Sequence, residues 1–182
     1  MFDTKVQFPQ EYFITYLTEG ESGIARQLIR AQDTNGRIYT RDGGKEMLYV
    51  PTDAGYAVYQ VAQGGLLVQG REQNMTKRYI DEQTKPFFDL AHKADAMRIG
   101  KSRTLPDETI AGRLCSVYEI EIRAAMFAQS FRCALDKATG ICLRWSMDAD
   151  LNGHHVPSKD DFTCTLFASE NVSSMLPLGV PR

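Results

Sequence analysis

The chain has 182 residues, of which 43% are hydrophobic and 24% are charged. This composition is typical of a globular protein with a substantial core, and we expect one domain over residues 1–182. The 21 Lys and Arg residues nearly balance the 23 Asp and Glu residues, and this net charge of −2 excludes the basic excess of a nucleic-acid-binding protein. No run of 18 apolar residues occurs, and therefore no transmembrane helix is predicted.

The first part of the chain alternates between apolar runs and turn signals, which predicts a series of strands. Strands are expected over residues 12–17, 24–32, 37–40, 45–50, 56–61 and 66–68. Asn35-Gly36 is a favoured hairpin dipeptide, because both residues accept positive φ. Six tyrosines crowd into these strands, where they fit either an ordinary core rim or the mouth of a cavity: Tyr12, Tyr16, Tyr39, Tyr49, Tyr56 and Tyr59.

The period becomes helical between Lys85 and Met97. Apolar side chains recur at i, i+3, i+4 and i+7, which predicts an amphipathic helix: Phe87, Leu90, Ala91 and Ala94. Thr84 can cap this helix and Gly100 can end it. Residues 101–109, which include Pro106, are expected to form a polar connection.

The stretch from Ile110 to Ala168 contains four runs in which apolar and polar residues alternate. This pattern predicts a four-strand antiparallel meander with one dry face and one wet face. The dry face is expected to carry Tyr118, Phe131, Leu143 and Trp145, and whatever covers it decides the function. The tail from Ser173 onward is expected to be mobile.

All four cysteines lie in these predicted strands, without a CxxC spacing that would indicate zinc. Cys115 and Cys133 lie near mirror positions of one hairpin, so a one-residue bulge would allow a disulfide. The favoured alternative is that all four are small, buried, free thiols.

The sequence offers no convincing catalytic or metal site. Residues 148–153 begin like a calcium loop, but Lys159 stands where the bidentate Glu is needed. His154 and His155 are adjacent and fit a solvated loop, while Glu119 and Glu121 fit the wet face of a strand. No nucleophile elbow, P-loop or dinucleotide fingerprint occurs. We therefore predict no enzymatic activity, no cofactor and no metal.

Two motifs in the second half resemble the lipoprotein-carrier-like (LolA-like) superfamily. Its pattern (I/V)xGxxxxxY is matched by Gly112 and Tyr118. Its hairpin pattern (L/W)DxxTGxxLR is matched by Leu135, Asp136, Thr139, Gly140, Leu143 and Arg144. From about residue 110 onward, the resemblance rests on the motifs. In the first half of the chain, it rests on the order of the predicted elements alone. This chain departs from the superfamily in having four cysteines and only one clear plug helix.

The resemblance implies an α+β, mainly β fold: a curved, unclosed antiparallel half-barrel with an amphipathic helix plugging its concave face. It also implies a non-enzymatic binding or carrier module for a hydrophobic ligand, a lipid or a lipoprotein acyl chain, in the bacterial envelope. Another envelope protein is a second candidate partner. The residues expected to line the ligand site are Phe87, Phe88, Leu90, Tyr118, Phe131, Leu143 and Trp145.

The alternative is an envelope interaction or sensor module with a fully packed core and no ligand. The first ten residues lack the apolar stretch of a signal peptide. We expect an extracytoplasmic protein, membrane-anchored or secreted, if the N-terminus has been trimmed, and a cytoplasmic protein otherwise.

Overall fold

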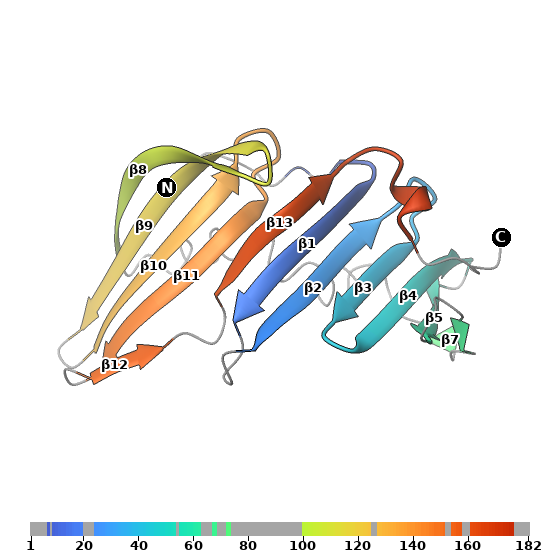
Figure 1. Cartoon of the computed structure of the whole chain (residues 1–182), viewed down its shortest axis with the longest axis horizontal. Coiled ribbons are helices and arrows are strands. Elements are labelled where there is room, and N and C mark those ends of the chain that lie inside the picture. The colour runs from blue at the N-terminus through green and yellow to red at the C-terminus, as the bar shows by residue number, and fades with distance from the viewer. Residues whose placement is uncertain are drawn as a thin grey trace. The chain divides into compact units, whose positions relative to one another are not determined.

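The computed structural model describes residues 7, 9–19, 24–53, 55–62, 67–68, 72–73, 100–124, 127–151, 154–157 and 161–176. These residues form 13 strands and one short 3₁₀ helix (Figure 1). The elements are β1 (Tyr12–Glu19), β2 (Ala25–Gln32), β3 (Ile38–Asp42), β4 (Lys45–Thr52), β5 (Gly55–Val61), β6 (Leu67–Val68), β7 (Glu72–Gln73), β8 (Gly100–Ile110), β9 (Arg113–Ala124), β10 (Phe127–Asp136), β11 (Cys142–Leu151), β12 (His154–Pro157), β13 (Phe162–Ala168) and η2 (Val172–Ser174).

Hydrogen bonds join the strands in the order β6-β5-β4-β3-β2-β1-β13-β11-β10-β9-β8, with β12 on β11 and β7 on β5. The sheet formed by the described residues is open, because β6 and β8 are the two ends of this order and are not hydrogen-bonded to each other. The prediction of an unclosed antiparallel sheet is therefore confirmed for the described residues. The predicted plug helix, residues 85–97, lies outside them.

The chain divides into two compact units. The meander unit holds β8 to β12, together with residues 16–25 and the first part of β13. The hairpin unit holds residues 9–15 and 26–86, which contain most of β2 and β3 to β7, together with residues 166–182. The single-domain assignment made from the sequence stays a prediction.

Buried side chains lie on both faces of the hairpin unit's strands. One cluster contains Phe13, Ile29, Ala31, Tyr39, Leu48, Val61, Val172 and Leu176. A second contains Ile38 and Tyr56, with Tyr49 packed against it. Tyr12, Tyr16, Tyr39 and Tyr56 are all buried. These four tyrosines therefore belong to the core; the Tyr39 hydroxyl satisfies its polar tip by donating to Glu46 at 2.7 Å.

A turn forms at Asn35-Gly36, but it is not the predicted tight hairpin: residues 33–37 join β2 to β3, and Gly36 has a positive φ of 76° whereas Asn35 does not. The carboxylate of Asp33 shapes it, because it accepts the backbone N–H of Asn35 at 3.0 Å and that of Arg37 at 2.9 Å. The guanidinium of Arg37 pairs with the second oxygen of Asp33. Asp33 is fully buried, and these bonds offset the cost of burying its charge.

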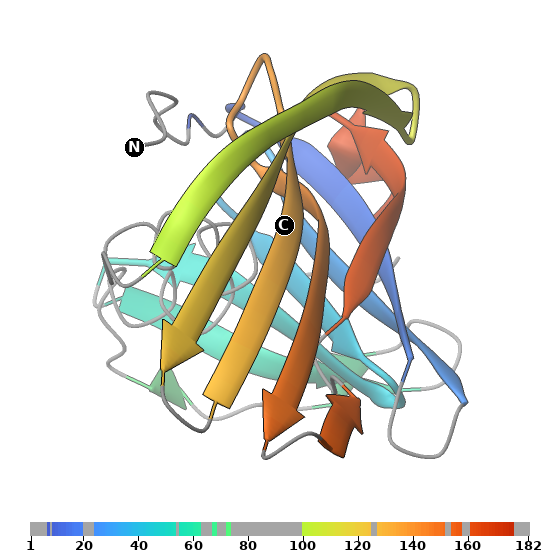
Figure 2. The same ribbon diagram turned by 90° about the vertical axis from the view of Figure 1, so that its left-hand side faces the viewer.

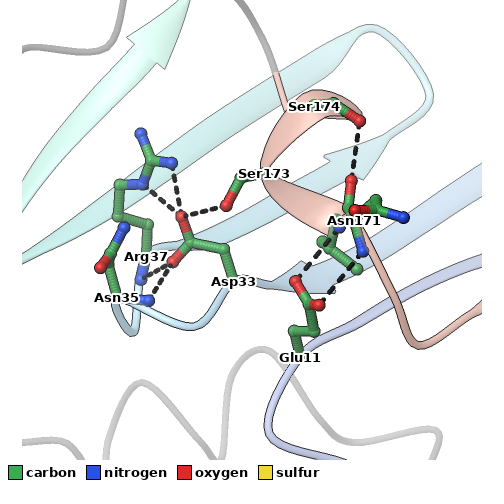
Figure 3. Close-up of polar contacts among 8 residues, drawn as sticks. Glu11, Asp33, Asn35, Arg37, Asn171, Ser173 and Ser174 are labelled. Atoms are coloured by element: carbon green, nitrogen blue, oxygen red, sulfur yellow. Dashed lines mark hydrogen bonds and ion pairs between the residues drawn. The ribbon is translucent and has the colours of Figure 1, made fainter.

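The residues after β13 fold back onto the hairpin unit through η2 (Figure 3). Glu11 accepts the backbone N–H groups of Asn171 at 3.1 Å and Val172 at 3.2 Å. The Ser173 hydroxyl contacts Asp33 at 3.4 Å. Val172 is completely buried, and Leu176 is 4% exposed. The prediction of a mobile tail is therefore wrong for Ser173 to Leu176, because Val172 and Leu176, four and eight residues beyond the end of β13, complete the core.

Replacing Val172 by Ala should lower the free energy of unfolding by about 2 kcal/mol, because it removes two buried methyl groups and leaves a cavity. Met175→Ala is the matched control, since Met175 lies in the same turn and is 40% exposed. Urea unfolding measures both. Equal midpoints for the two variants would contradict the packing role assigned to this turn.

The meander unit is built from long hairpins, whose strands lie side by side in Figure 2. β9 and β10 pair over ten positions, and β10 and β11 over nine. A β-bulge between Ala134 and Leu135 of β10 leaves Leu143 out of register, because Cys142 and Arg144 take the paired positions. Leu143 is fully buried at this irregularity.

The prediction of a polar connection over residues 101–109 is wrong, because β8 pairs with β9 at residues 101–105 and 108–109. β8 is an end strand, so only one of its edges needs backbone partners, and little apolar alternation is required. Pro106 falls where the register shifts between Leu105 and Glu108. A proline is tolerated there, since a bulge position makes no ladder hydrogen bond.

The predicted four-strand meander also differs from the structure in its last part. Residues 154–157, expected as a loop, form β12 and pair with Asp148 to Leu151 of β11. β13 follows only after β12, and it pairs with β11 at Arg144↔Thr163 and Trp145↔Phe162. The pattern of residues 162–168 predicted a strand correctly. It could not predict which strands pair with β13, because that depends on contacts between distant parts of the chain.

The hairpin between β10 and β11 is organised by Asp136, which is 2% exposed. Its carboxylate accepts the N–H of Thr139 at 2.9 Å, the hydroxyl of Thr139 at 2.6 Å and the guanidinium of Arg113 at 2.8 Å. Gly140 completes the turn at φ 72°. The DxxTG motif is thus a hairpin-forming device. Burial alone would raise the pKa of Asp136, but the bonds from Arg113 and Thr139 outweigh it and hold the pKa below its usual value of 3.8.

Replacing Asp136 by Ala should cost about 2–3 kcal/mol of unfolding free energy, because Thr139 and the partly exposed Arg113 lose their shared partner. A carboxyl with a lowered folded pKa stabilises the fold above its unfolded pKa, and this contribution is lost as the pH falls below about 4. The wild type should therefore lose more stability than Asp136→Ala between pH 6 and pH 3. Lys137→Ala, which alters an exposed ion pair with Asp107, is the control; a parallel pH dependence of all three proteins would contradict the assignment.

Candidate functional site

The candidate site is an apolar patch on one face of the meander unit, formed by Tyr118, Phe131, Cys133, Trp145 and Met147. Cys133 of β10 lies opposite Tyr118 of β9 and Trp145 of β11. Phe131 lies opposite Met147. Directly opposed residues of antiparallel strands point to the same face. Three of the residues predicted to line a ligand site, Tyr118, Phe131 and Trp145, are therefore brought together.

The apolar patch has a buried centre and a partly exposed rim. Cys133 is completely buried, and Trp145 is 6% exposed. Tyr118, Phe131 and Met147 remain partly accessible. The rings of Phe131 and Trp145 lie 5.1 Å apart at an interplanar angle of 41°. This arrangement offers aromatic and sulfur surface of the kind that contacts apolar groups well.

Other predicted lining residues have different positions. Leu143 is fully buried at the bulge, between the paired residues Cys142 and Arg144 of β11. Phe87, Phe88 and Leu90 lie outside the described residues. The structure adds Phe162, which lies opposite Trp145 and is 2% exposed. The alternation of Phe162 with Cys164 in the sequence predicted that Phe162 faces the dry side of the sheet. The sequence did not predict which strand lies next to it.

The opposite face of the meander unit carries ion pairs beside buried apolar residues such as Val117 and Ala134. Glu108 of β8 pairs with both Arg132 of β10 and Arg144 of β11. Glu119 pairs with Arg103, its register partner on β8. Glu119 thus occupies the wet face, as predicted, where its carboxylate forms an ion pair with the guanidinium of Arg103. Exposed pairs of this kind contribute about 1 kcal/mol or less each, so they mark the solvated face more than they stabilise it.

The cysteines form no disulfide in the structure, and all four are buried. Cys115 lies opposite Asp136, and Cys133 lies opposite Tyr118, so the register separates the pair that the hairpin pattern placed together. The alternative of buried thiols is the one found. Burial raises the pKa of Cys115 to about 11 and that of Cys133 to about 12, and burial also raises the pKa of Cys142. Thiols of this kind are poor nucleophiles.

Native protein should therefore react slowly with an aromatic disulfide reagent at pH 8, whereas the protein in guanidinium chloride should release four equivalents of the chromophore. The reason is that both access and ionisation are suppressed in the fold. The absorbance of the released thiolate measures the stoichiometry and the rate. A fast native phase of one or more equivalents would contradict the burial of these side chains.

Metal chemistry finds no support in the described part of the chain, where no three His, Cys, Asp or Glu side chains gather as candidate ligands. Asp148 and Asp150 lie in β11, and His155 of β12 lies opposite Asp150. A paired strand lacks the curled loop that a calcium site requires. None of the described helices is long and apolar enough to cross a membrane.

No family model matches the chain, and no curated protein matches it. A crystal structure of MucB aligns with 93% of this chain and 57% of its own, at 16% identity and a TM-score of 0.44. The MucA/MucB complex of Pseudomonas aeruginosa aligns with 87% of this chain and 51% of that chain, at 17% identity and a TM-score of 0.41. A domain assigned to outer membrane lipoprotein sorting, from Vibrio parahaemolyticus, aligns with 88% and 86%, at 10% identity and a TM-score of 0.26.

The chain spans about half the length of the MucB structures that it matches. Identities below 25% and TM-scores below 0.5 describe a likeness in the course of the chain, and they say nothing about ligand or partner. The resemblance to the lipoprotein-carrier-like (LolA-like) superfamily therefore rests on the sequence motifs around Gly112, Tyr118 and Asp136.

Proposed function

We propose that the chain is a non-enzymatic binding module of the bacterial envelope that holds an apolar ligand, a lipid or an acyl chain, on the apolar patch. One observation carries this proposal. Tyr118, Phe131 and Met147 stay partly accessible at the rim of a face whose centre, Cys133 and Trp145, is buried. Partly exposed apolar side chains around a dry centre favour an apolar partner.

The ligand's expected size follows from the energetics of burial. Each CH₂ group removed from water contributes about 0.8 kcal/mol. Association costs at least about 4 kcal/mol, and micromolar affinity requires a net gain of about 8 kcal/mol. About 15 buried CH₂ groups are then needed, which favours an acyl chain of 16 or 18 carbons over a short acid.

The proposed lining combines described and undescribed residues. Tyr118, Phe131 and Trp145 supply the sheet side of the site, with Leu143 supporting them from the core. Phe87, Phe88 and Leu90 would supply apolar surface from the segment between β7 and β8. An envelope location follows from the resemblance in fold, and it remains part of the proposal.

Trp145 is the only tryptophan of the chain, so its fluorescence reports on the apolar patch. A dibrominated 18-carbon fatty acid should quench this fluorescence saturably, because bromine quenches an indole on contact. Phe131→Ala should weaken the apparent affinity roughly tenfold, since it removes a large apolar contact of the ligand. Leu114→Ala is the matched control on β9, where Leu114 is 52% exposed, and it should bind like the wild type.

Unbrominated stearate should compete with the brominated acid and restore the fluorescence. Absence of saturable quenching, together with lipid-free protein in native mass spectrometry after purification from cells, would overturn the proposal. That result would favour the alternative, an envelope interaction or sensor module whose core is fully packed.

A further inference from the structure

The pairing between β11 and β13 is short within the described residues. There, β11 pairs with β10 over nine positions and with β13 at two, Arg144↔Thr163 and Trp145↔Phe162. We call these four residues the seam. Because few ladder hydrogen bonds hold a short pairing, it is the natural place for a sheet to open locally.

Two side chains bind the backbone of β11 on either side of the seam. The Asp161 carboxylate accepts the N–H of Met147 at 2.9 Å. The Tyr16 hydroxyl donates to the carbonyl oxygen of Cys142 at 3.0 Å. Beyond Met147, β12 becomes the partner of β11, and it lies along that end of the strand in Figure 1. On both sides of the seam, a side chain therefore takes the place of a backbone hydrogen-bond partner for β11.

The two faces of the seam differ in chemistry. Trp145 and Phe162 lie on the apolar side, 6% and 2% exposed, and the Tyr16 ring meets Phe162 edge-on at 5.0 Å. Arg144 and Thr163 point to the other side. The four seam residues, together with Leu17, Ser146, Asp161 and Thr165, line a hollow of about 340 Å³. Space for movement thus lies beside the seam.

We propose that the seam is the entrance of the apolar patch: β13 parts from β11, Phe162 leaves Trp145, and the indole becomes accessible beside Phe131. The ligand's part in this inference rests on the proposed function. The physical reason is that Trp145 is 6% exposed and has Phe162 as its register partner on β13, so parting the two strands removes one of its neighbours and exposes the indole. We call Asp161 and Tyr16 the latches, because the side chain of each hydrogen-bonds the backbone of β11 beside the seam.

The latches are tested first without ligand, by acrylamide quenching of Trp145 and by hydrogen exchange of the β11 amides. Asp161→Ala removes the acceptor for Met147, whereas Asp161→Asn keeps a carbonyl oxygen there. Tyr16→Phe keeps the ring against Phe162 and removes only the hydroxyl. Asp161→Ala and Tyr16→Phe should raise quenching and exchange roughly fivefold or more. Asp161→Asn should stay near the wild type, which separates the hydrogen bond from a general loss of packing.

Hydrogen exchange in the β9–β10 hairpin should remain unchanged in all variants, which shows that the fold is intact. A rise confined to the seam and its flanks supports the proposal. Wild-type quenching and exchange in both Asp161→Ala and Tyr16→Phe would overturn it. So would equal increases for Asp161→Ala and Asp161→Asn, because the hydrogen bond would then not be the latch.

The ligand arm follows the association rate of the dibrominated 18-carbon acid by stopped-flow quenching of Trp145. The two opening variants should bind it several-fold faster than the wild type and Asp161→Asn. Saturable binding at one common rate in all four proteins would overturn the entrance. No binding in any of the proteins would refute the proposed function and the ligand's entrance with it, while the acrylamide and exchange results would still decide whether the seam opens.

Discussion

The register of β10 against its two neighbours is the constraint on which the rest of the meander unit depends. With Cys133 opposite both Tyr118 and Trp145, three strands place their aromatic side chains on one face and their ion pairs on the other. A slip of one residue would exchange the two faces completely. The turn held by Asp136, Thr139 and Arg113 opposes such a slip, because its hydrogen bonds fix where β10 ends and β11 begins.

Side chains replace backbone partners beside the β11–β13 pairing and at the start of η2. Asp161 and Tyr16 do so at the first place, and Glu11 does so at the second. A buried backbone group without a partner is costly, so each irregular place in the sheet needs a polar side chain of the right length. The sheet can open locally at these places, because a side-chain hydrogen bond can break while the backbone hydrogen bonds between the neighbouring strands remain.

Much of the fold was predictable because the strands are long and alternating, and the turns contain Asn-Gly or Asp-x-x-Thr-Gly. The sequence reasoning failed at β8 and β12, where end position and pairing partner mattered more than alternation. Pro106 argued against a strand, yet a bulge in an end strand accommodates it. Cys115 and Cys133 looked like mirror positions, but a register pairing Cys133 with Tyr118 separates them. For the candidate site, the common face of Tyr118, Phe131 and Trp145 was predictable, whereas the neighbour of Trp145, Phe162, was not.

The sequence by itself determined which side chains point to the dry face within each strand, since alternation has a period of two residues and needs no distant contact. It also determined the turns, whose geometry depends on a few neighbouring residues. Only the tertiary structure decided that β13 follows β12 onto β11 through two residue pairs, and that Val172 and Leu176 complete a core. These features join residues that are distant in sequence, and their free energy comes from burial and pairing that a local pattern does not encode.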